Sequence, residues 1–379
     1  MTPPVVVAGT LVGAPEHPTG RGWVELRDAQ IAAIGSGPAP TPPEDLGDVV
    51  VVPGFVDLQV NGVGHHDFAS AGVDDWLAAL GFLARRGTTA CLPTLVSAPL
   101  DSYDAILEIA RAARDLASRD DAHAVAQVLG LHLEGPFLGG APGAHVREHV
   151  RAVDLEWLEG LLDRHGDLIR MVTLAPEADP HYAATRLLAA HGIVVALGHS
   201  TASYDDAIAA AAAGARVVTH VFNGMAALHH RAPGLAGAAL TVAGLTPTVI
   251  ADLVHVHPAV VDLVVRARPD GVLVSDAVAA TGGAAGPVAL RDAGDAARLA
   301  DGTLAGSTIT MADAVRNTVE TGAPLDVAVA MASARPASLL GDRERGRLEV
   351  GARADVVALD AETLEPLATW VGGRRAHAD

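Results

Sequence analysis

The sequence predicts an α/β fold, a (β/α)₈ TIM-like barrel with a small β-sandwich domain built from both chain termini. The chain has 379 residues, half of them hydrophobic, which is enough for a large barrel and an accessory domain. From about residue 49, short apolar runs alternate with helical patterns. Short strands with turns occupy both ends. We therefore expect residues 1–52 and 346–379 to form the small domain and residues 53–345 the barrel.

The two ends of the chain predict short strands because apolar, partly β-branched runs are separated there by Gly, Pro and Asp. At the start the runs are 5–9, 22–26 and 30–35, followed by a Pro-rich loop at 37–47. At the end the same pattern returns at 346–360 and 369–376.

The middle of the chain contains eight apolar runs in order, as a (β/α)₈ barrel requires. They are 49–60, 88–96, 125–134, 169–176, 193–199, 216–222, 246–256 and 271–278. Helical patterns stand between or after them at 74–87, 102–118, 203–215, 311–322 and 324–341. A doubly wound open sheet is the alternative, but no GxGxxG motif follows the first run.

Composition excludes several classes of function. The net charge of −19 disfavours a nucleic-acid or membrane-surface partner. All 26 basic residues are arginine, which excludes Schiff-base lysine chemistry, Walker-A ATPases and a carboxylated lysine that bridges two metals. The single cysteine, Cys91, excludes an intramolecular disulfide and a multi-cysteine zinc site. With no signal peptide or membrane span recognised, we expect a soluble, cytoplasmic protein.

Polar residues stand at the carboxyl end of nearly every predicted barrel strand, where barrel enzymes place their catalytic groups. They are Asp57, Gln59, Asn61, His132, Glu134, His199, His220, Asp252, His255 and Asp276. One such histidine alone is more often a hydrogen-bonded core residue. Five strand ends that converge with carboxylates and imidazoles instead favour a divalent metal site.

Glutamate, two histidines and a nearby aspartate suit zinc or ferrous iron. A metal of this kind lowers the pKa of a water molecule to about 7 and makes it a nucleophile. The remaining carboxylate, Asp276, can take the proton of that water and return it to a leaving group. The strand-end pattern therefore predicts hydrolysis of an amide or a related bond.

Seven motifs resemble those of the N-acetylglucosamine-6-phosphate deacetylases, in the amidohydrolase superfamily. They are PGFVDLQVNG (53–62), GLHLEGPF (130–137), GHS (198–200), THVFNGM (219–225), HRAPG (230–234), SDA (275–277) and GTLAGSTITM (302–311). The resemblance runs through nearly the whole chain. Many superfamily members carry HxH at the end of strand one for a second metal, whereas Gln59, Val60 and Asn61 stand there, as in the single-metal form.

The resemblance implies roles for particular residues. Glu134, His199 and His220 would bind one divalent ion per chain, zinc before Fe²⁺ or another divalent ion, and Asp276 would be the general acid and base. Arg231 would reach the phosphate in the neighbouring subunit's site, which implies a homodimer. The implied substrate contacts are Ala144, His145, Asn223, Gly224, Arg231, Asp252, His255, Leu304, Ala305 and Gly306.

The expected activity is therefore removal of the acetyl group from N-acetyl-D-glucosamine 6-phosphate, a small-molecule amino-sugar phosphate. The same reaction on the galacto epimer is an alternative. A non-catalytic sugar-phosphate sensor is a further one, although all the proposed catalytic residues are present. A cyclic-amide hydrolase is disfavoured because HxH and lysine are both missing. Whether His65, His66, His229 and His230 contribute to the site stays open.

Overall fold

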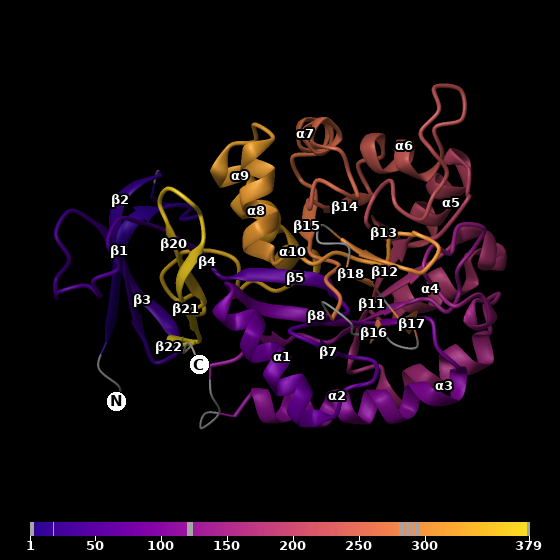
Figure 1. Cartoon of the computed structure of the whole chain (residues 1–379), viewed down its shortest axis with the longest axis horizontal. Helices are drawn as coiled ribbons and strands as arrows, with labels where there is room; N and C mark the ends of the chain where they lie inside the picture. Colours follow the sequence, from indigo (N-terminus) through magenta and orange to yellow (C-terminus); the bar gives the residue numbers. More distant parts are fainter. Residues whose placement is uncertain are drawn as a thin grey trace.

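The computed structural model describes residues 4–17, 19–119, 124–279, 284–285, 288–289, 291–292 and 296–376. Residues 1–3 and 377–379, at the ends of the predicted small domain, lie outside this description. Two large sheets organise the described chain, one in a barrel surrounded by helices and one beside it, at the left of Figure 1.

Eight parallel strands of the described chain form the barrel in the order β15-β14-β13-β12-β11-β10-β8-β5. Their bounds are β5 Phe55–Val60, β8 Thr88–Val96, β10 Leu131–Glu134, β11 Ile169–Leu174, β12 Val194–Leu197, β13 Ala215–Val218, β14 Thr246–Ile250 and β15 Val272–Val274. The predicted run 125–134 contains a short additional strand, β9 (Gln127–Val128), which pairs with β8. Each predicted run thus supplies a barrel strand.

The barrel is closed by backbone hydrogen bonds between the segments that follow its first and last strands. The Asp276 N–H donates to the Gln59 carbonyl at 2.8 Å, and the Asn61 N–H donates to the Ala277 carbonyl at 2.7 Å. Closure therefore takes place at the carboxyl end of the strands and uses residues that the sequence singled out for chemistry.

Helices follow the strands along the chain and cover the barrel (Figure 1). Their bounds are α1 Val73–Arg85, α2 Tyr103–Ala117, α3 Leu155–His165, α4 Ala183–Ala190, α5 Tyr204–Ala213, α6 Gly234–Thr241, α7 Pro258–Ala267, α8 Met311–Glu320, α9 Leu325–Ala332 and α10 Ala334–Leu339. The predicted helix 324–341 is divided in two, because Ser333 has φ −135° and ψ −77°, outside the helical region.

Strands from both ends of the chain form the second sheet, which is drawn in indigo and yellow in Figure 1. Its order within the described residues is β22-β21-β20-β4-β1-β2-β3. Their bounds are β1 Val5–Leu11, β2 Gly20–Arg27, β3 Gln30–Ser36, β4 Val49–Pro53, β20 Val356–Asp360, β21 Pro366–Val371 and β22 Arg374–Arg375. The sheet curls over a core of its own that includes Val24, Val356 and Trp370. Because the sheet curls, the Ile31 N–H of β3 donates to the Ala352 carbonyl, which precedes β20, at 2.8 Å.

Strand β4 belongs to both hydrophobic cores because successive side chains of a strand point to opposite sides. Val49 and Val51 pack in the core of the small sheet, whereas Val50 and Val52 pack in the core of the barrel. The predicted strand 49–60 is divided at Gly54, where β4 ends and β5 begins. A side chain at Gly54 would collide with Thr89 of β8, so only glycine fits against β8 at this point.

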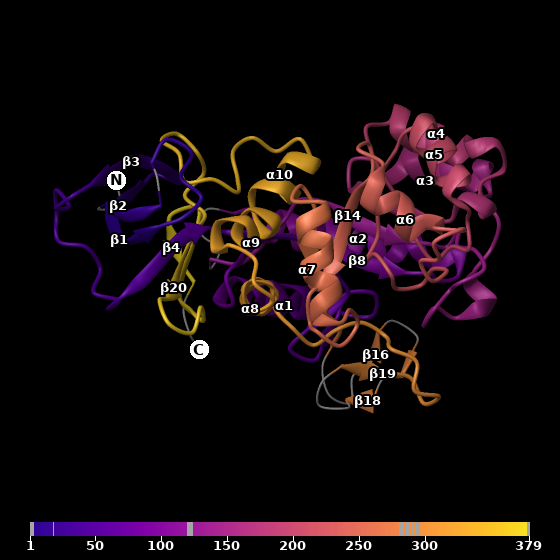
Figure 2. The same ribbon diagram turned by 90° about the horizontal axis from the view of Figure 1, so that it is seen from above.

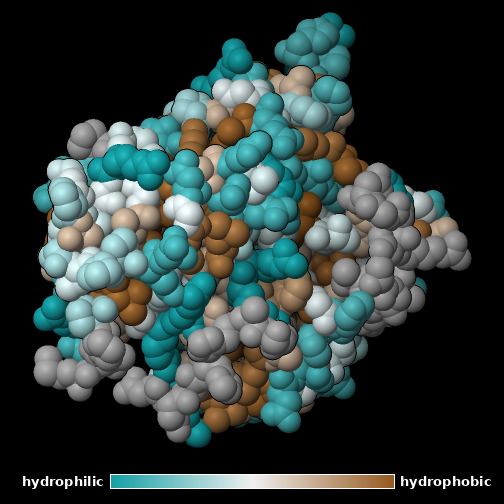
Figure 3. Space-filling view, turned by 60° about the vertical axis from the view of Figure 1, so that its left-hand side comes forward, coloured by the Kyte–Doolittle hydropathy of each residue, from teal (hydrophilic) through white to brown (hydrophobic). Residues whose placement is uncertain are grey.

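Short hairpins occur besides the two large sheets, and Figure 2 shows β16, β18 and β19 outside the ring of barrel strands. They pair β6 (Gly62–Val63) with β7 (His66–Asp67), β16 (Ala284–Ala285) with β17 (Val288–Ala289), and β18 (Arg291–Asp292) with β19 (Ala297–Arg298). On the face shown in Figure 3, hydrophobic residues form separate patches among hydrophilic ones. No helix within the described ranges has the length and apolar character needed to cross a membrane.

Candidate metal and substrate site

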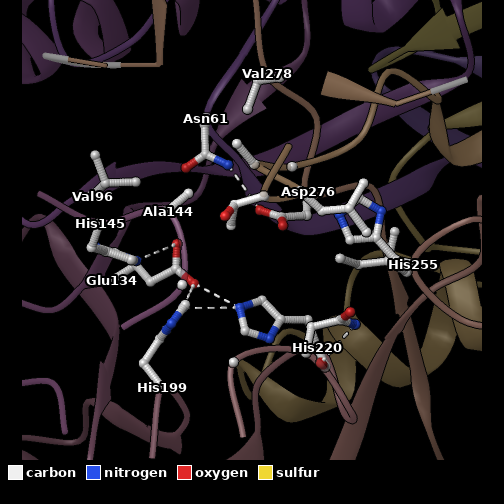
Figure 4. Close-up of a pocket in the computed structure, with 18 of the residues that line it drawn as sticks. Asn61, Val96, Glu134, Ala144, His145, His199, His220, His255, Asp276 and Val278 are labelled. Atoms are coloured by element: carbon white, nitrogen blue, oxygen red, sulfur yellow. Dashed lines mark hydrogen bonds and ion pairs between the residues drawn. The ribbon is translucent and has the colours of Figure 1, made fainter. Parts of the chain in front are cut away.

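Four of the predicted site residues stand at the carboxyl ends of barrel strands. Glu134 is the last residue of β10, and His199, His220 and Asp276 each stand two residues after a strand. The last three have positive φ angles of 49°, 28° and 48°, which residues other than glycine rarely adopt. Strained backbone of this kind is concentrated at functional sites. Here all three residues line the same pocket as Glu134 (Figure 4).

Glu134, His199 and His220 bring one donor atom each to a single point. Oε1 of Glu134 lies 3.0 Å from His199 Nε2 and 2.9 Å from His220 Nε2, and the two nitrogens are 3.1 Å apart. All three side chains are buried. Two imidazole nitrogens and a carboxylate oxygen are a usual ligand set for a divalent metal in a hydrolase. The residues present therefore fit a divalent metal ion.

His145 offers a second combination, because donor atoms of Glu134, His145 and His199 also lie within 4.8 Å of one another. However, the Ser97 N–H donates to His145 Nδ1 at 3.2 Å, and burial lowers the pKa of His145 to about 3. The neutral ring then carries its proton on Nε2, which lies 3.8 Å from Glu134 Oε2. This distance is longer than the 2.9 Å between His220 Nε2 and Glu134 Oε1, so the geometry favours His220 as the third ligand.

The electrostatics of the cluster keep Glu134 ionised. Burial alone would raise the pKa of Glu134, but hydrogen bonds from His199 and His220 outweigh burial and hold this pKa well below its ordinary value. Burial would likewise lower the pKa of His220, and the adjacent Glu134 carboxylate raises it instead. The Glu134 carboxylate is thus a buried negative charge, as a site for a cation requires.

The two amides at the end of β5 each bind a carboxylate of the site. Gln59 Nε2 donates to Glu134 Oε1 at 2.9 Å, and Asn61 Nδ2 donates to Asp276 Oδ1 at 2.8 Å. Burial, and after it the charge of Glu134, raises the pKa of Asp276 well above its ordinary value. A carboxyl group with a raised pKa can accept and return a proton near neutral pH.

These groups open into a cavity of about 420 Å³, which is within the range of small-molecule pockets. Most of the predicted substrate contacts line it, namely Ala144, His145, Asn223, Gly224, His255, Leu304, Ala305 and Gly306. At Gly224 a Cβ atom would lie 2.8 Å from His199 Nδ1, so the absence of a side chain leaves room for that ring. Lining residues that were not predicted as site residues are Val96, Ser97, Gly143, Val146, Ile250, Val278, Arg298, Gly302 and Thr303.

Two predicted contact residues are not among the described residues that line the pocket. Asp252 stands behind His255, and its Oδ2 accepts a hydrogen bond from His255 Nδ1 at 2.6 Å. Arg231 is exposed on the segment between β13 and α6, with Nη1 2.7 Å from His230 Nε2. Their substrate contacts remain predictions. In the described lining, His65, His66, His229 and His230 are also absent.

Sequence reasoning missed Glu177, which joins two loops of the site. Its Oε1 accepts from the N–H groups of Thr201 at 2.7 Å and Gly140 at 3.1 Å, and its Oε2 accepts from Ser200 Oγ at 2.6 Å. Burial would raise the pKa of Glu177, and these hydrogen bonds lower it overall. The strand-end signal could have found Glu177, because it stands three residues after β11.

The sequence is similar to proteins of known activity. The profile of the Amidohydrolase family matches residues 50–376. The N-acetylglucosamine-6-phosphate deacetylase of Bos taurus is 37% identical over 352 residues, which cover 87% of this chain and 84% of that protein. The N-acetylgalactosamine-6-phosphate deacetylase of Escherichia coli is 38% identical over 380 residues, which cover 94% of this chain and 97% of that protein.

The structure has similar relatives as well. A variant of the N-acetyl-D-glucosamine-6-phosphate deacetylase of Mycobacterium smegmatis, solved in complex with N-acetyl-D-glucosamine-6-phosphate, matches with a TM-score of 0.90 and 33% identity. The match covers all of both chains. The family implies a divalent metal, and the Glu134, His199 and His220 cluster provides a place for one. The chain belongs to the amidohydrolase family, among the deacetylases of acetamido-sugar phosphates.

Proposed function

We propose that the protein hydrolyses N-acetyl-D-glucosamine 6-phosphate to D-glucosamine 6-phosphate and acetate, a step in amino-sugar breakdown. One observation carries the proposal. Glu134, His199, His220 and Asp276 line one pocket in a chain that is 37% identical to a deacetylase of this substrate over most of its length. The bond broken is the linear amide C–N bond of the acetamido group.

The proposal includes one divalent ion per chain, zinc in the first place, held by Glu134, His199 and His220. An ion there polarises the amide carbonyl and makes water more acidic. A single ion is supported because Gln59 and Asn61 point amide N–H groups at Glu134 and Asp276, and such groups are not metal ligands. Elemental analysis should return one ion per chain, and His199→Ala should lose both metal and activity. Two ions per chain at full activity would contradict this part of the proposal.

Asp276 is the proposed proton carrier. Its carboxylate accepts a proton from the attacking water and then donates it to the amine nitrogen as the C–N bond breaks. Asn61 already donates to Oδ1, which leaves Oδ2 as the oxygen that exchanges the proton. The raised pKa of Asp276 supports this role because the group must both take and release a proton in each turnover.

The sugar is proposed to contact the remaining predicted residues of the lining. His255 is presented to it with Nδ1 held by Asp252, so that Nε2 is the atom available to a ligand. We further propose a homodimer in which Arg231 of the partner subunit reaches the phosphate. Support comes from the exposed position of Arg231 on a segment that projects from the molecule at the upper right of Figure 1.

We also propose that the protein acts in the cytoplasm. A sugar phosphate carries a charged group that does not cross the apolar interior of a membrane, so a substrate of this kind stays in the compartment in which it is formed. Fractionation of cells should recover the deacetylase activity with the cytoplasmic fraction.

The galacto epimer is the second candidate substrate, because the Escherichia coli relative that acts on it covers 94% of this chain at 38% identity. Acetate release should be measured with both 6-phosphates, and the proposal expects the higher kcat/KM for the gluco epimer. A higher kcat/KM for the galacto epimer would identify that epimer as the substrate instead. If metal-loaded protein releases acetate from neither 6-phosphate, the result would favour the alternative of a non-catalytic sugar-phosphate sensor.

A further inference from the structure

We infer that Arg298 binds the phosphate group of the substrate, within the same chain whose Asp276 and metal cluster act on the acetamido group. The inference rests on the proposed function, because it requires a phosphorylated sugar. Arg298 ends β19 and lines the pocket together with Thr303, Leu304 and Ala305. No motif of the sequence drew attention to it.

The charges of the pocket call for such a residue. Its described lining contains two carboxylates, Glu134 and Asp276, and Arg298 is its one arginine. The chain contains no lysine and has a net charge of −19. A phosphate dianion therefore needs a local positive charge, and a guanidinium can give it two parallel hydrogen bonds. Arg298 is the residue of the described lining that can do this.

Arg298 has hydrogen-bond donors to spare. Its Nη1 donates to the Gly302 carbonyl at 3.2 Å, and within the described chain it forms no ion pair with a carboxylate. Many other arginines do, including Arg268 with Asp270 and Arg316 with Asp313. The side chain is half-buried at the pocket. Its remaining N–H groups are therefore available to a ligand, whereas those of the paired arginines bind carboxylates.

The backbone places Arg298 away from the reacting end of the pocket. The Ser307 N–H donates to the Asp276 carbonyl at 2.8 Å, which fixes one end of the segment. Further along, Arg298 pairs with Leu304 in an antiparallel bridge, and the Ala305 N–H donates to the Ala297 carbonyl at 3.0 Å. Leu304 is three residues from Ser307, or roughly 10 Å in extended backbone. A hexose likewise separates its 2-acetamido group from its 6-phosphate across the ring.

Arg298 and Arg231 would serve the phosphate from different chains. Arg231 is exposed and is not among the described lining residues of its own pocket. Arg298 lines the pocket of the chain that carries Asp276. A single chain would therefore recognise the phosphate before any contribution from a partner.

The test compares kcat and KM of wild type, Arg298→Ala and Arg298→Lys with N-acetylglucosamine 6-phosphate and with unphosphorylated N-acetylglucosamine. Arg298→Ala should raise KM for the phosphorylated substrate about 10- to 100-fold and leave kcat unchanged. The KM for the unphosphorylated sugar should not change. Arg298→Lys should recover part of the loss, because it keeps the charge without the two-pronged geometry. Arg266→Ala is the matched control, since Arg266 is exposed, pairs with Asp262 on α7 and is not among the described residues that line the pocket.

Equal losses with both sugars would overturn the inference, because they would indicate a structural effect on the pocket. An unchanged KM for the phosphorylated sugar would overturn it too. Calorimetry with glucosamine 6-phosphate separates this failure from that of the proposed function. A wild-type protein that binds this ligand but releases no acetate refutes the proposed function. An Arg298→Ala protein that binds it as tightly as wild type refutes the inference.

Discussion

At the scale of single residues, the side-chain amides of Gln59 and Asn61 organise the two carboxylates of the site. Each gives one N–H group to a carboxylate oxygen, at 2.9 Å for Glu134 and 2.8 Å for Asp276. A neutral donor fixes the orientation of a carboxylate without adding a charge that would compete with a cation. The two carboxylates can therefore differ in function, Glu134 as the proposed metal ligand and Asp276 as the proposed proton carrier.

Replacing Asp276 with Asn tests the second of these functions. The side chain keeps its shape but can no longer accept a proton, so we expect turnover to fall by about 10²–10⁴-fold. Metal content should stay at the wild-type value, because the cluster of Glu134, His199 and His220 is unchanged. Acetate release and elemental analysis measure the two effects. If the variant keeps most of its turnover, another group carries the proton, and His145 is the next candidate.

Asp57 makes stability depend on pH. It is fully buried, and burial raises its pKa to about 6 from the ordinary 3.8, although Ser275 Oγ and the Gln59 N–H donate to it. The native state thus binds this proton more tightly than the unfolded chain does. The stabilisation that the protonated group provides is complete below about pH 4 and is lost as pH rises through about 6.

Asp57→Asn should remove this dependence. Relative to wild type, we expect its free energy of unfolding to increase between pH 4 and pH 7 by on the order of 3 kcal/mol, since each pKa unit corresponds to about 1.4 kcal/mol. Denaturant titrations of both proteins at several pH values measure the difference. A difference that is constant over this range would show that the native state does not raise the pKa of Asp57.

At the scale of elements, Glu177 connects the loop after β10 to the loop after β12. It accepts the N–H of Gly140 from the first loop, and the N–H of Thr201 and the hydroxyl of Ser200 from the second. Ser200 directly follows the proposed ligand His199. Hydrogen bonds behind a ligand hold it in the orientation that binds the metal.

Glu177→Gln should therefore weaken metal binding without removing a ligand. A glutamine keeps the size of the side chain but has one acceptor oxygen, so at least one donor loses its partner. We expect metal affinity to fall about 10- to 100-fold, as measured by competition with a chelator. Excess metal should restore activity. The exposed Glu159 of α3 gives the control variant Glu159→Gln, and equal affinity in both variants would exclude this role for Glu177.

The sequence predicted the barrel strands well because each is an apolar run bounded by polar residues. It did not predict the breaks at Gly54 and Ser333, because the apolar pattern continues through both. The strand-end pattern predicted that Glu134, His199, His220 and Asp276 lie together, because strand ends converge in a barrel, and all four line one pocket. Arg298 was missed because its place in the pocket depends on how a hairpin folds back, which no strand-end pattern indicates.

At the scale of the whole molecule, the proposed dimer makes a prediction about mixed subunits. Arg231→Ala and Asp276→Asn chains should each be impaired alone. In a mixed dimer, one site combines Asp276 of the first chain with Arg231 of the second, and we expect activity to return on mixing. Native mass spectrometry confirms that mixed dimers form. If they form without recovery, Arg231 serves its own subunit's site or none.

The curled sheet contains strands from both ends of the chain, and β4 and β20 pair within it, with Val52 opposite Val357. A mechanical load applied between the two chain ends therefore passes from β1 to β4 and through β20 to β21, and bypasses the barrel. The hydrogen bonds that close the barrel at Asp276 bear none of that load. Tethering the protein to a surface or a scaffold by its ends would accordingly strain the small sheet first and leave the geometry of the pocket unchanged.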